Sequence, residues 1–190
     1  MRRLNNCLES KKYTNIPIWF LRQAGRYLKE FRDIRKNNPD FINLCLNQKL
    51  VNEISLQPIK KFDLDAVILF SDILIIPYGL GQKVTFKKNI GPILGDLNLD
   101  LILNVKENDF INRINPVYKS LNLLKNNMDY KNKSLIGFAG APWTLLLYMI
   151  HKQSPKKDFN KNKILNDKNL LNNLIVKLED IICLHIDKQI

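Results

Sequence analysis

The residues best suited to chemistry are arginines that cluster near the start of the chain. Seven arginines occur among the 190 residues, and four fall within fourteen positions: Arg22, Arg26, Arg32 and Arg35. Lysine supplies nearly all other positive charge, so this cluster indicates a need for the paired hydrogen bonds that a guanidinium group makes to carboxylate or phosphate. The sequence therefore predicts a site for a ligand with several acidic groups. We expect Arg32 to form an ion pair with an acidic side chain. Arg35 could either form such a pair or bind the ligand.

Arg22 and Arg26 also admit a structural interpretation. Glu30 and Asp33 follow closely enough to pair with them on an ordinary solvated helix face. Gly25 favours the ligand site, because a glycine lets the backbone turn tightly and approach a ligand. Composition alone leaves both interpretations open.

Two further polar residues also admit both a ligand-binding and a structural interpretation. Asp72 follows the apolar run 66–70, and a carboxylate at the end of a buried strand needs a partner. It could stabilise positive charge or accept N–H bonds from a ligand, or it could be a turn aspartate satisfied by nearby backbone amides. Tyr148 stands among apolar residues, where core packing is the ordinary role, although its hydroxyl group could reach a ligand.

Three apolar runs predict the strands that position these residues: 16–21, 66–70 and 135–139. None alternates between apolar and polar residues, so we expect each to be covered on both faces, as in a parallel sheet. Helical patterns between them predict an α/β fold with right-handed crossovers. Each run is followed by polar or glycine-rich sequence. Because ligands bind at the carboxyl ends of parallel strands, these segments should meet at one rim.

The helical patterns cover 50–59, 111–124 and 171–185, with Pro58 and Pro116 inside the first two. Another helix should begin near Pro142, a favourable first-turn proline. Glycines around 84–86 predict a short hairpin or excursion loop.

Composition argues against several other classes of protein. The net charge is +12, but no basic stripe carries interleaved aromatic residues, which argues against nucleic-acid binding. Three distant cysteines form no CxxC pair, so we expect no zinc site and a reducing compartment, the cytoplasm. The uncharged stretch 134–150 is short of the ~20 residues of a membrane span and contains Pro142. A single domain is expected for this length.

Three segments resemble, in order and spacing, motifs of the uroporphyrinogen decarboxylase family. They are PIWFLRQAGRYLKEFRDIR (17–35), AVILFSDILIIP (66–77) and LIGFAGAPWTLLLYM (135–149). The resemblance implies a cofactor-free (β/α)8 TIM barrel that forms homodimers. It also implies removal of carbon dioxide from the four acetate side chains of uroporphyrinogen III, which gives coproporphyrinogen III in haem synthesis.

By position, the resemblance implies a substrate site of eight residues: Arg22, Gln23, Ala24, Gly25, Arg26, Arg35, Asp72 and Tyr148. Arg22 and Arg26 would bind substrate carboxylates. Asp72 would face the pyrrole N–H groups at the centre of the macrocycle and act as the catalytic residue. Tyr148 would contact the substrate, and Arg35 would lie near the cleft.

The chain departs from the family pattern in length. A complete barrel needs about 250 residues, so we expect a partial barrel of about three βα units, the truncated N-terminal portion of one domain. Lys29 also stands where the family motif usually has proline. Two hypotheses follow: part of an active decarboxylase, or a non-catalytic remnant that needs a missing C-terminal half. A basic binding protein of another class is a third hypothesis. Among enzymes, the zinc-dependent methyltransferases of the same superfamily rank last because they lack the arginine motif.

Overall fold

The computed structural model describes residues 2–10, 15–126, 132–154 and 168–190. The fold is mixed α/β, and it divides into two compact units. The first unit comprises Met1–Pro39, Asn43–Ser71 and Pro116–Gly137, and the second comprises Asp40–Ile42, Asp72–Asn115 and Phe138–Ile190. The boundary passes within the long helix α7 (Glu107–Asn126), just before Pro116.

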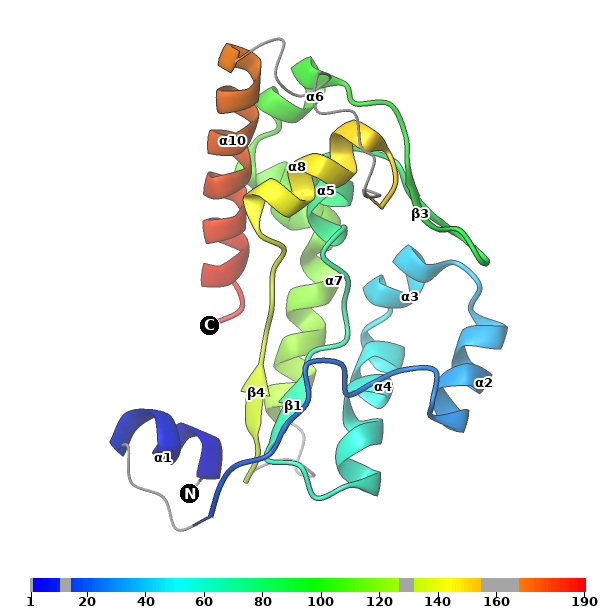
Figure 1. Cartoon of the computed structure of the whole chain (residues 1–190), viewed down its shortest axis with the longest axis vertical. Helices are drawn as coiled ribbons and strands as arrows, with labels where there is room; N and C mark the ends of the chain where they lie inside the picture. Colours follow the sequence, from blue (N-terminus) through cyan, green and yellow to red (C-terminus); the bar gives the residue numbers. More distant parts are fainter. Residues whose placement is uncertain (1, 11–14, 127–131, 155–167) are drawn as a thin grey trace. The chain divides into compact units, whose positions relative to one another are not determined.

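A parallel pair of strands forms the centre of the first unit (Figure 1). Strand β1 (Ala66–Ile68) pairs with β4 (Ser134–Ile136) in parallel, with Ala66 opposite Ser134. A hydrogen bond of 2.9 Å from the Leu69 amide to the Ile136 carbonyl extends the pairing beyond β1. The helices of this unit are α1 (Arg3–Ser10), α2 (Lys29–Asn37) and α4 (Gln48–Lys61), and α3 (Phe41–Leu46) straddles the boundary.

Helix α4 packs against β1 and carries much of the apolar core of the first unit. Its N-cap is Asn47, whose side chain accepts a hydrogen bond of 3.1 Å from the Leu50 amide. Val51 and Ile54 are completely buried, as are Ala66 and Val67 of the strand. Pro58 lies near the end of α4, where the helix continues only to Lys61.

The second unit contains a hairpin and a group of helices. Strand β2 (Val84–Lys87) pairs antiparallel with β3 (Gly91–Leu94). Helix α8 (Pro142–His151) packs against both α5 (Ile75–Gly79) and α10 (Lys168–Asp187), and α6 (Leu99–Asn104) also contacts α10. In the described residues, no helix is both long and apolar enough to cross a membrane.

Most of the predicted elements are confirmed. The helical patterns appear as α4, α7 and α10, the hairpin as β2 and β3, and the Pro142 helix as α8. The runs 66–70 and 135–139 give β1 and β4, which are shorter than predicted. Leu135 and Ile136 are only half-buried, so coverage on both faces is wrong for β4.

The predicted first strand, 16–21, is wrong as a strand and as a buried segment. It is irregular, and its apolar side chains other than Pro17 are 39–80% exposed. Its Ile18 carbonyl accepts one hydrogen bond from the Asp65 amide, but the Ile18 amide donates to the Asp65 side chain instead of a strand. Pro17 has no amide hydrogen to donate. One backbone bond does not make a ladder, so the segment lies beside the start of β1 without becoming part of the sheet.

Candidate functional site

The arginine loop, residues 20–28, joins the irregular segment to α2 through a series of turns. Arg22 and Arg26 are exposed, and the residues between them are buried or half-buried. The loop thus presents two guanidinium groups to solvent from a backbone that is packed against the protein. Gly25 has no positive φ, and a Cβ there would meet only the Tyr27 ring, at 3.7 Å, so other residues would fit.

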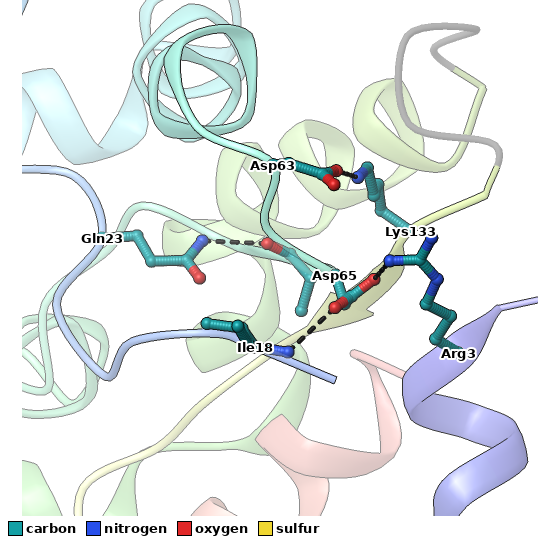
Figure 2. A network of polar contacts seen from close by, with 7 residues as sticks. Arg3, Ile18, Gln23, Asp63, Asp65 and Lys133 are labelled. Carbon is teal, nitrogen blue, oxygen red and sulfur yellow. Dashed lines mark hydrogen bonds and ion pairs between the residues drawn. The ribbon is translucent and has the colours of Figure 1, made fainter. Parts of the chain in front are cut away.

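Two anchors hold this loop and the chain just before it to the start of β1 (Figure 2). At the first, the Asp65 amide donates to the Ile18 carbonyl, and the Ile18 amide donates to Asp65 Oδ2, each at 2.8 Å. At the second, Gln23 Nε2 donates to the Ala66 carbonyl at 2.9 Å, and Gln23 Oε1 accepts from the Phe20 amide at 3.1 Å. Gln23 is 3% exposed, so its amide group is used inside the protein.

The second half of the loop is held by hydrogen bonds among its own residues and from Arg32 of α2. The Tyr27 hydroxyl donates to the Gln23 carbonyl, and the Leu28 amide donates to the Gly25 carbonyl at 3.0 Å. Arg32 Nη1 donates to the carbonyls of Arg26 and Tyr27, at 2.8 and 3.1 Å. Among the described residues, the partners of Arg32 are therefore these two backbone carbonyls, and the predicted ion pair with an acidic side chain is wrong.

The predicted alternative, Arg–Glu pairing on a helix face, does not describe this loop. Glu30 pairs with Lys61 at 2.8 Å, and this ammonium group lowers the pKa of the Glu30 carboxyl. Within the described ranges, neither Arg22 nor Arg26 has an ion pair or a side-chain hydrogen bond. Arg35, in contrast, donates to the Asn38 carbonyl at the end of α2. Two charged groups of the loop are therefore open to an anionic ligand.

Asp72 begins the turn that leads into α5, in the second unit. Its Oδ1 accepts a hydrogen bond of 2.9 Å from the Leu74 amide, and its carbonyl accepts one of 3.1 Å from the Ile75 amide. Burial raises the pKa of its carboxyl, and the Leu74 bond offsets this only in part. Among the described residues, the Leu74 amide is the one donor to this carboxylate, which leaves several of its lone pairs unused, so the turn role and a ligand role are compatible. The neighbouring Ser71 hydroxyl group is buried without a hydrogen-bond partner among the described residues.

Tyr148 lies on α8, also in the second unit, and is half-buried. Its hydroxyl group is 3.3 Å from the Ser154 hydroxyl, so it is not confined to an apolar core. The turn before α8 lies close to the Asp72 turn, because a Cβ on Gly140 would be 3.0 Å from Cβ of Ile73. The predicted site residues therefore form two groups: the arginine loop and Arg35 in the first unit, and Asp72 and Tyr148 in the second.

Sequence reasoning missed Asp65 as a residue of the site. It is 5% exposed, and its backbone joins two segments, since its carbonyl also accepts a hydrogen bond of 2.9 Å from the Ser134 amide. The available signal was an acidic residue immediately before the apolar run 66–70, where a buried carboxylate requires partners. None of the three cysteines, which all lie within the described ranges, forms a disulfide: Cys45 is buried, Cys7 half-buried and Cys183 exposed.

Similarities in fold and sequence identify the class of protein. A methyltransferase from Methanosarcina mazei superposes with a TM-score of 0.67 at 14% identity, over 94% of this chain and 52% of that protein. This likeness and the parallel β1–β4 pair define a mixed α/β protein with a TIM-barrel-like fold.

The pattern of the family "Uroporphyrinogen decarboxylase (URO-D)" matches residues 1–190. The uroporphyrinogen decarboxylase of Rickettsia canadensis (strain McKiel) is 41% identical over 184 residues, 93% of this chain and 53% of that protein. That of Campylobacter jejuni is 39% identical over 92% of this chain and 52% of its own length. The chain belongs to the uroporphyrinogen decarboxylase family and spans about half the length of these relatives.

Proposed function

We propose that this chain provides the carboxylate-binding and catalytic-aspartate portion of a uroporphyrinogen decarboxylase. The reaction removes the four acetate carboxyl groups of uroporphyrinogen III and gives coproporphyrinogen III in haem synthesis. The observation that carries the proposal is the arginine loop, which holds Arg22 and Arg26 exposed and without ion pairs among the described residues. An octacarboxylate ligand supplies the missing anionic partners, and each charge-assisted hydrogen bond contributes about 1.5–3 kcal/mol.

In this proposal the loop binds substrate through both side chains and backbone. Arg22 and Arg26 take carboxylates, while Gln23, Ala24 and Gly25 form the wall between them. Arg35 contributes positive charge from the end of α2, where its bond to Asn38 fixes its direction.

Asp72 is the proposed catalytic residue. Loss of carbon dioxide leaves an electron pair that needs a sink, and a pyrrole ring protonated on carbon supplies one without a cofactor. A fixed carboxylate stabilises the resulting cation, and preorganised charge of this kind contributes several kcal/mol in a dry site. Asp72 suits this role because its turn fixes the carboxylate, which is half-buried and partly shielded from water. Tyr148 would contact the substrate through its hydroxyl group.

The proposal includes a partial barrel of about three βα units, within one domain of the longer relatives. The segment 16–21 already runs beside the start of β1, and its exposed apolar side chains suit coverage by further strands. The relatives contain about as much chain again as the part that matches. A homodimer and a cytoplasmic location, as the family resemblance implies, belong to the same proposal.

Substrate binding and turnover test the proposal separately. The purified chain should bind uroporphyrin, the oxidised octacarboxylate form, more tightly than the tetracarboxylate coproporphyrin, and Arg22→Ala and Arg26→Ala should each reduce that preference. Incubation with uroporphyrinogen should then show coproporphyrinogen by chromatography. Binding without turnover would favour the non-catalytic portion that needs a C-terminal half, for which the exposed segment 16–21 already argues. A chain that binds both porphyrins equally, or neither, would contradict the proposed substrate site.

A further inference from the structure

We propose that Asp65 is a positioning residue for substrate binding, which acts together with the Gln23 side chain to hold the arginine loop in its binding conformation. The inference rests on the proposed function, since it explains how that site is held. Neither side chain needs to touch the substrate for this role.

Asp65 forms two hydrogen bonds with the chain just before the loop. Its backbone amide donates to the Ile18 carbonyl, and its carboxylate accepts from the Ile18 amide, so both polar groups of Ile18 are tied to one residue. The second bond is charge-assisted and is stronger than a bond between neutral groups. The segment would otherwise be held weakly, since it belongs to no sheet and exposes most of its apolar side chains.

The Asp65 carboxylate is itself supported. Arg3 Nη1 of α1 lies 3.5 Å from Asp65 Oδ1, so the two carboxylate oxygens have different partners. The side chain of Asp65 is only 7% exposed, whereas that of Arg3 is 53% exposed. Burying a carboxylate without such partners costs free energy, so the bonds to Ile18 and Arg3 explain how Asp65 can be buried here.

Gln23 provides the second anchor, on the other side of Arg22. Both ends of its amide group are used: Nε2 on the Ala66 carbonyl and Oε1 on the Phe20 amide. Ala66 follows Asp65 directly, so both anchors are attached to the same point at the start of β1 (Figure 2). Fixing the backbone on both sides of Arg22 lowers the ordering cost when its guanidinium group binds a carboxylate.

Asp63 offers a matched control. It is another aspartate at the start of β1, but its side chain is 80% exposed and pairs with Lys133 at 2.8 Å. Among the described residues, its carboxylate makes no hydrogen bond to the arginine loop; Figure 2 shows it directed at Lys133. Asp63→Ala therefore removes the same group two residues away and leaves both anchors intact.

The deciding measurement is the ratio of the affinities for uroporphyrin and coproporphyrin, by fluorescence titration of the 190-residue chain. Asp65→Ala should weaken uroporphyrin binding by about tenfold or more and coproporphyrin binding by less, so that the ratio falls. Gln23→Leu, of similar volume, should act in the same direction. Asp65→Asn, which keeps an oxygen for the Ile18 amide, should recover much of the ratio, and Asp63→Ala should leave it unchanged.

Hydrogen exchange gives a second readout that needs no ligand. The Ile18 amide should exchange faster in Asp65→Ala and the Phe20 amide faster in Gln23→Leu, while Asp63→Ala should change neither. A merely structural defect would weaken the binding of both porphyrins equally and leave the ratio of their affinities unchanged. That result would overturn the inference.

The arginine variants separate this inference from the proposed function. If Arg22→Ala lowers the ratio but Asp65→Ala and Gln23→Leu do not, the substrate site stands and the positioning role is wrong. If the arginine variants leave the ratio unchanged, or the unaltered chain shows no preference for uroporphyrin, both proposals are wrong. Asp65→Asn and Gln23→Leu keep the test decisive where Asp65→Ala does not fold.

Discussion

The Ser55 hydroxyl group of α4 accepts a hydrogen bond of 2.9 Å from the Phe70 amide, just beyond β1. Ser55 also donates to the Val51 carbonyl at 2.7 Å, so one buried side chain forms hydrogen bonds with both its own helix and a residue just beyond the strand. Serine is neutral to unfavourable in the middle of a helix, and the hydrogen bond to Phe70 explains its presence here. The contact fixes where the chain leaves β1, two residues before Asp72.

Replacement of Ser55 by alanine should destabilise the protein by about 1–3 kcal/mol, because the Phe70 amide would lose its partner in a partly buried position. Ser120→Ala is the matched control, since the buried Ser120 hydroxyl group donates to the Pro116 carbonyl of its own helix and has no other hydrogen bond among the described residues. Urea denaturation of both variants checks this. Equal losses would show that the strand contact contributes nothing beyond the helix contact.

Gly140 should tolerate no side chain. A Cβ there would lie 2.8 Å from Leu145 Cδ2 and 3.0 Å from Cβ of Ile73, both closer than ordinary contacts. Gly140→Ala should therefore cost about 1–3 kcal/mol through strain between the turn before α8 and the Asp72 turn. Gly25→Ala is the comparison, because its Cβ would meet only the Tyr27 ring, at 3.7 Å. A melting temperature that falls as much for Gly25→Ala as for Gly140→Ala would contradict this.

Periodicity predicted the helices well, because long amphipathic patterns such as that of α10 are set by the residues themselves. The segment 16–21 shows the opposite case. Its apolar run is typical of a buried strand, but a strand also requires neighbours that donate and accept along its length, and local sequence does not specify them. Asp65 takes the Ile18 amide through its side chain, a contact that no spacing pattern indicates.

For the candidate site, the sequence indicated the charged residues but not the hydrogen bonds that hold them. Arginine type and spacing predicted an anionic ligand, and the resemblance implied which one; both stay predictions. The anchors were not predictable, because Gln23 in the motif gives no sign that its amide reaches Ala66, which is distant in sequence. The Asp72 turn was foreseen as one of two interpretations, and its geometry is compatible with both.

His185 should make the protein sensitive to acid. It is 2% exposed on α10, and burial lowers its pKa to about 4, although a hydrogen bond with the Phe138 backbone partly offsets the effect. The unfolded chain binds this proton near pH 6.5, so the free energy of unfolding should fall as the pH drops from 6.5 towards 4. The loss from this group amounts to about 3 kcal/mol in total.

Replacement of His185 by leucine should remove that part of the pH dependence. Denaturation curves at several pH values between 7 and 4 compare the two proteins directly. The difference in unfolding free energy between variant and unaltered protein should grow in favour of the variant as the pH falls. A difference that stays constant with pH would show that His185 is protonated as easily in the folded protein as in the unfolded one.

Asp72 should be unfavourable for stability and necessary for activity. Burial raises the pKa of its carboxyl, so its contribution to stability is present at low pH and is lost as the pH rises through the folded pKa, where the buried group must ionise. Asp72→Asn keeps an oxygen for the Leu74 amide but carries no charge. The variant should therefore gain stability relative to the unaltered protein between pH 4 and pH 7.

The same variant should lose turnover, because a neutral amide cannot stabilise the substrate cation. In a form of the enzyme that is active, Asp72→Asn and Asp72→Ala should lose far more turnover than Arg35→Ala, whose guanidinium group is engaged at the end of α2. Denaturation at the two pH values and an assay for coproporphyrinogen measure the two effects independently. A stabilised variant with full turnover would remove Asp72 from the chemistry and leave it the turn role alone. A variant that is less stable at pH 7 than at pH 4, relative to the unaltered protein, would show that the carboxylate is stabilised by more than the Leu74 amide.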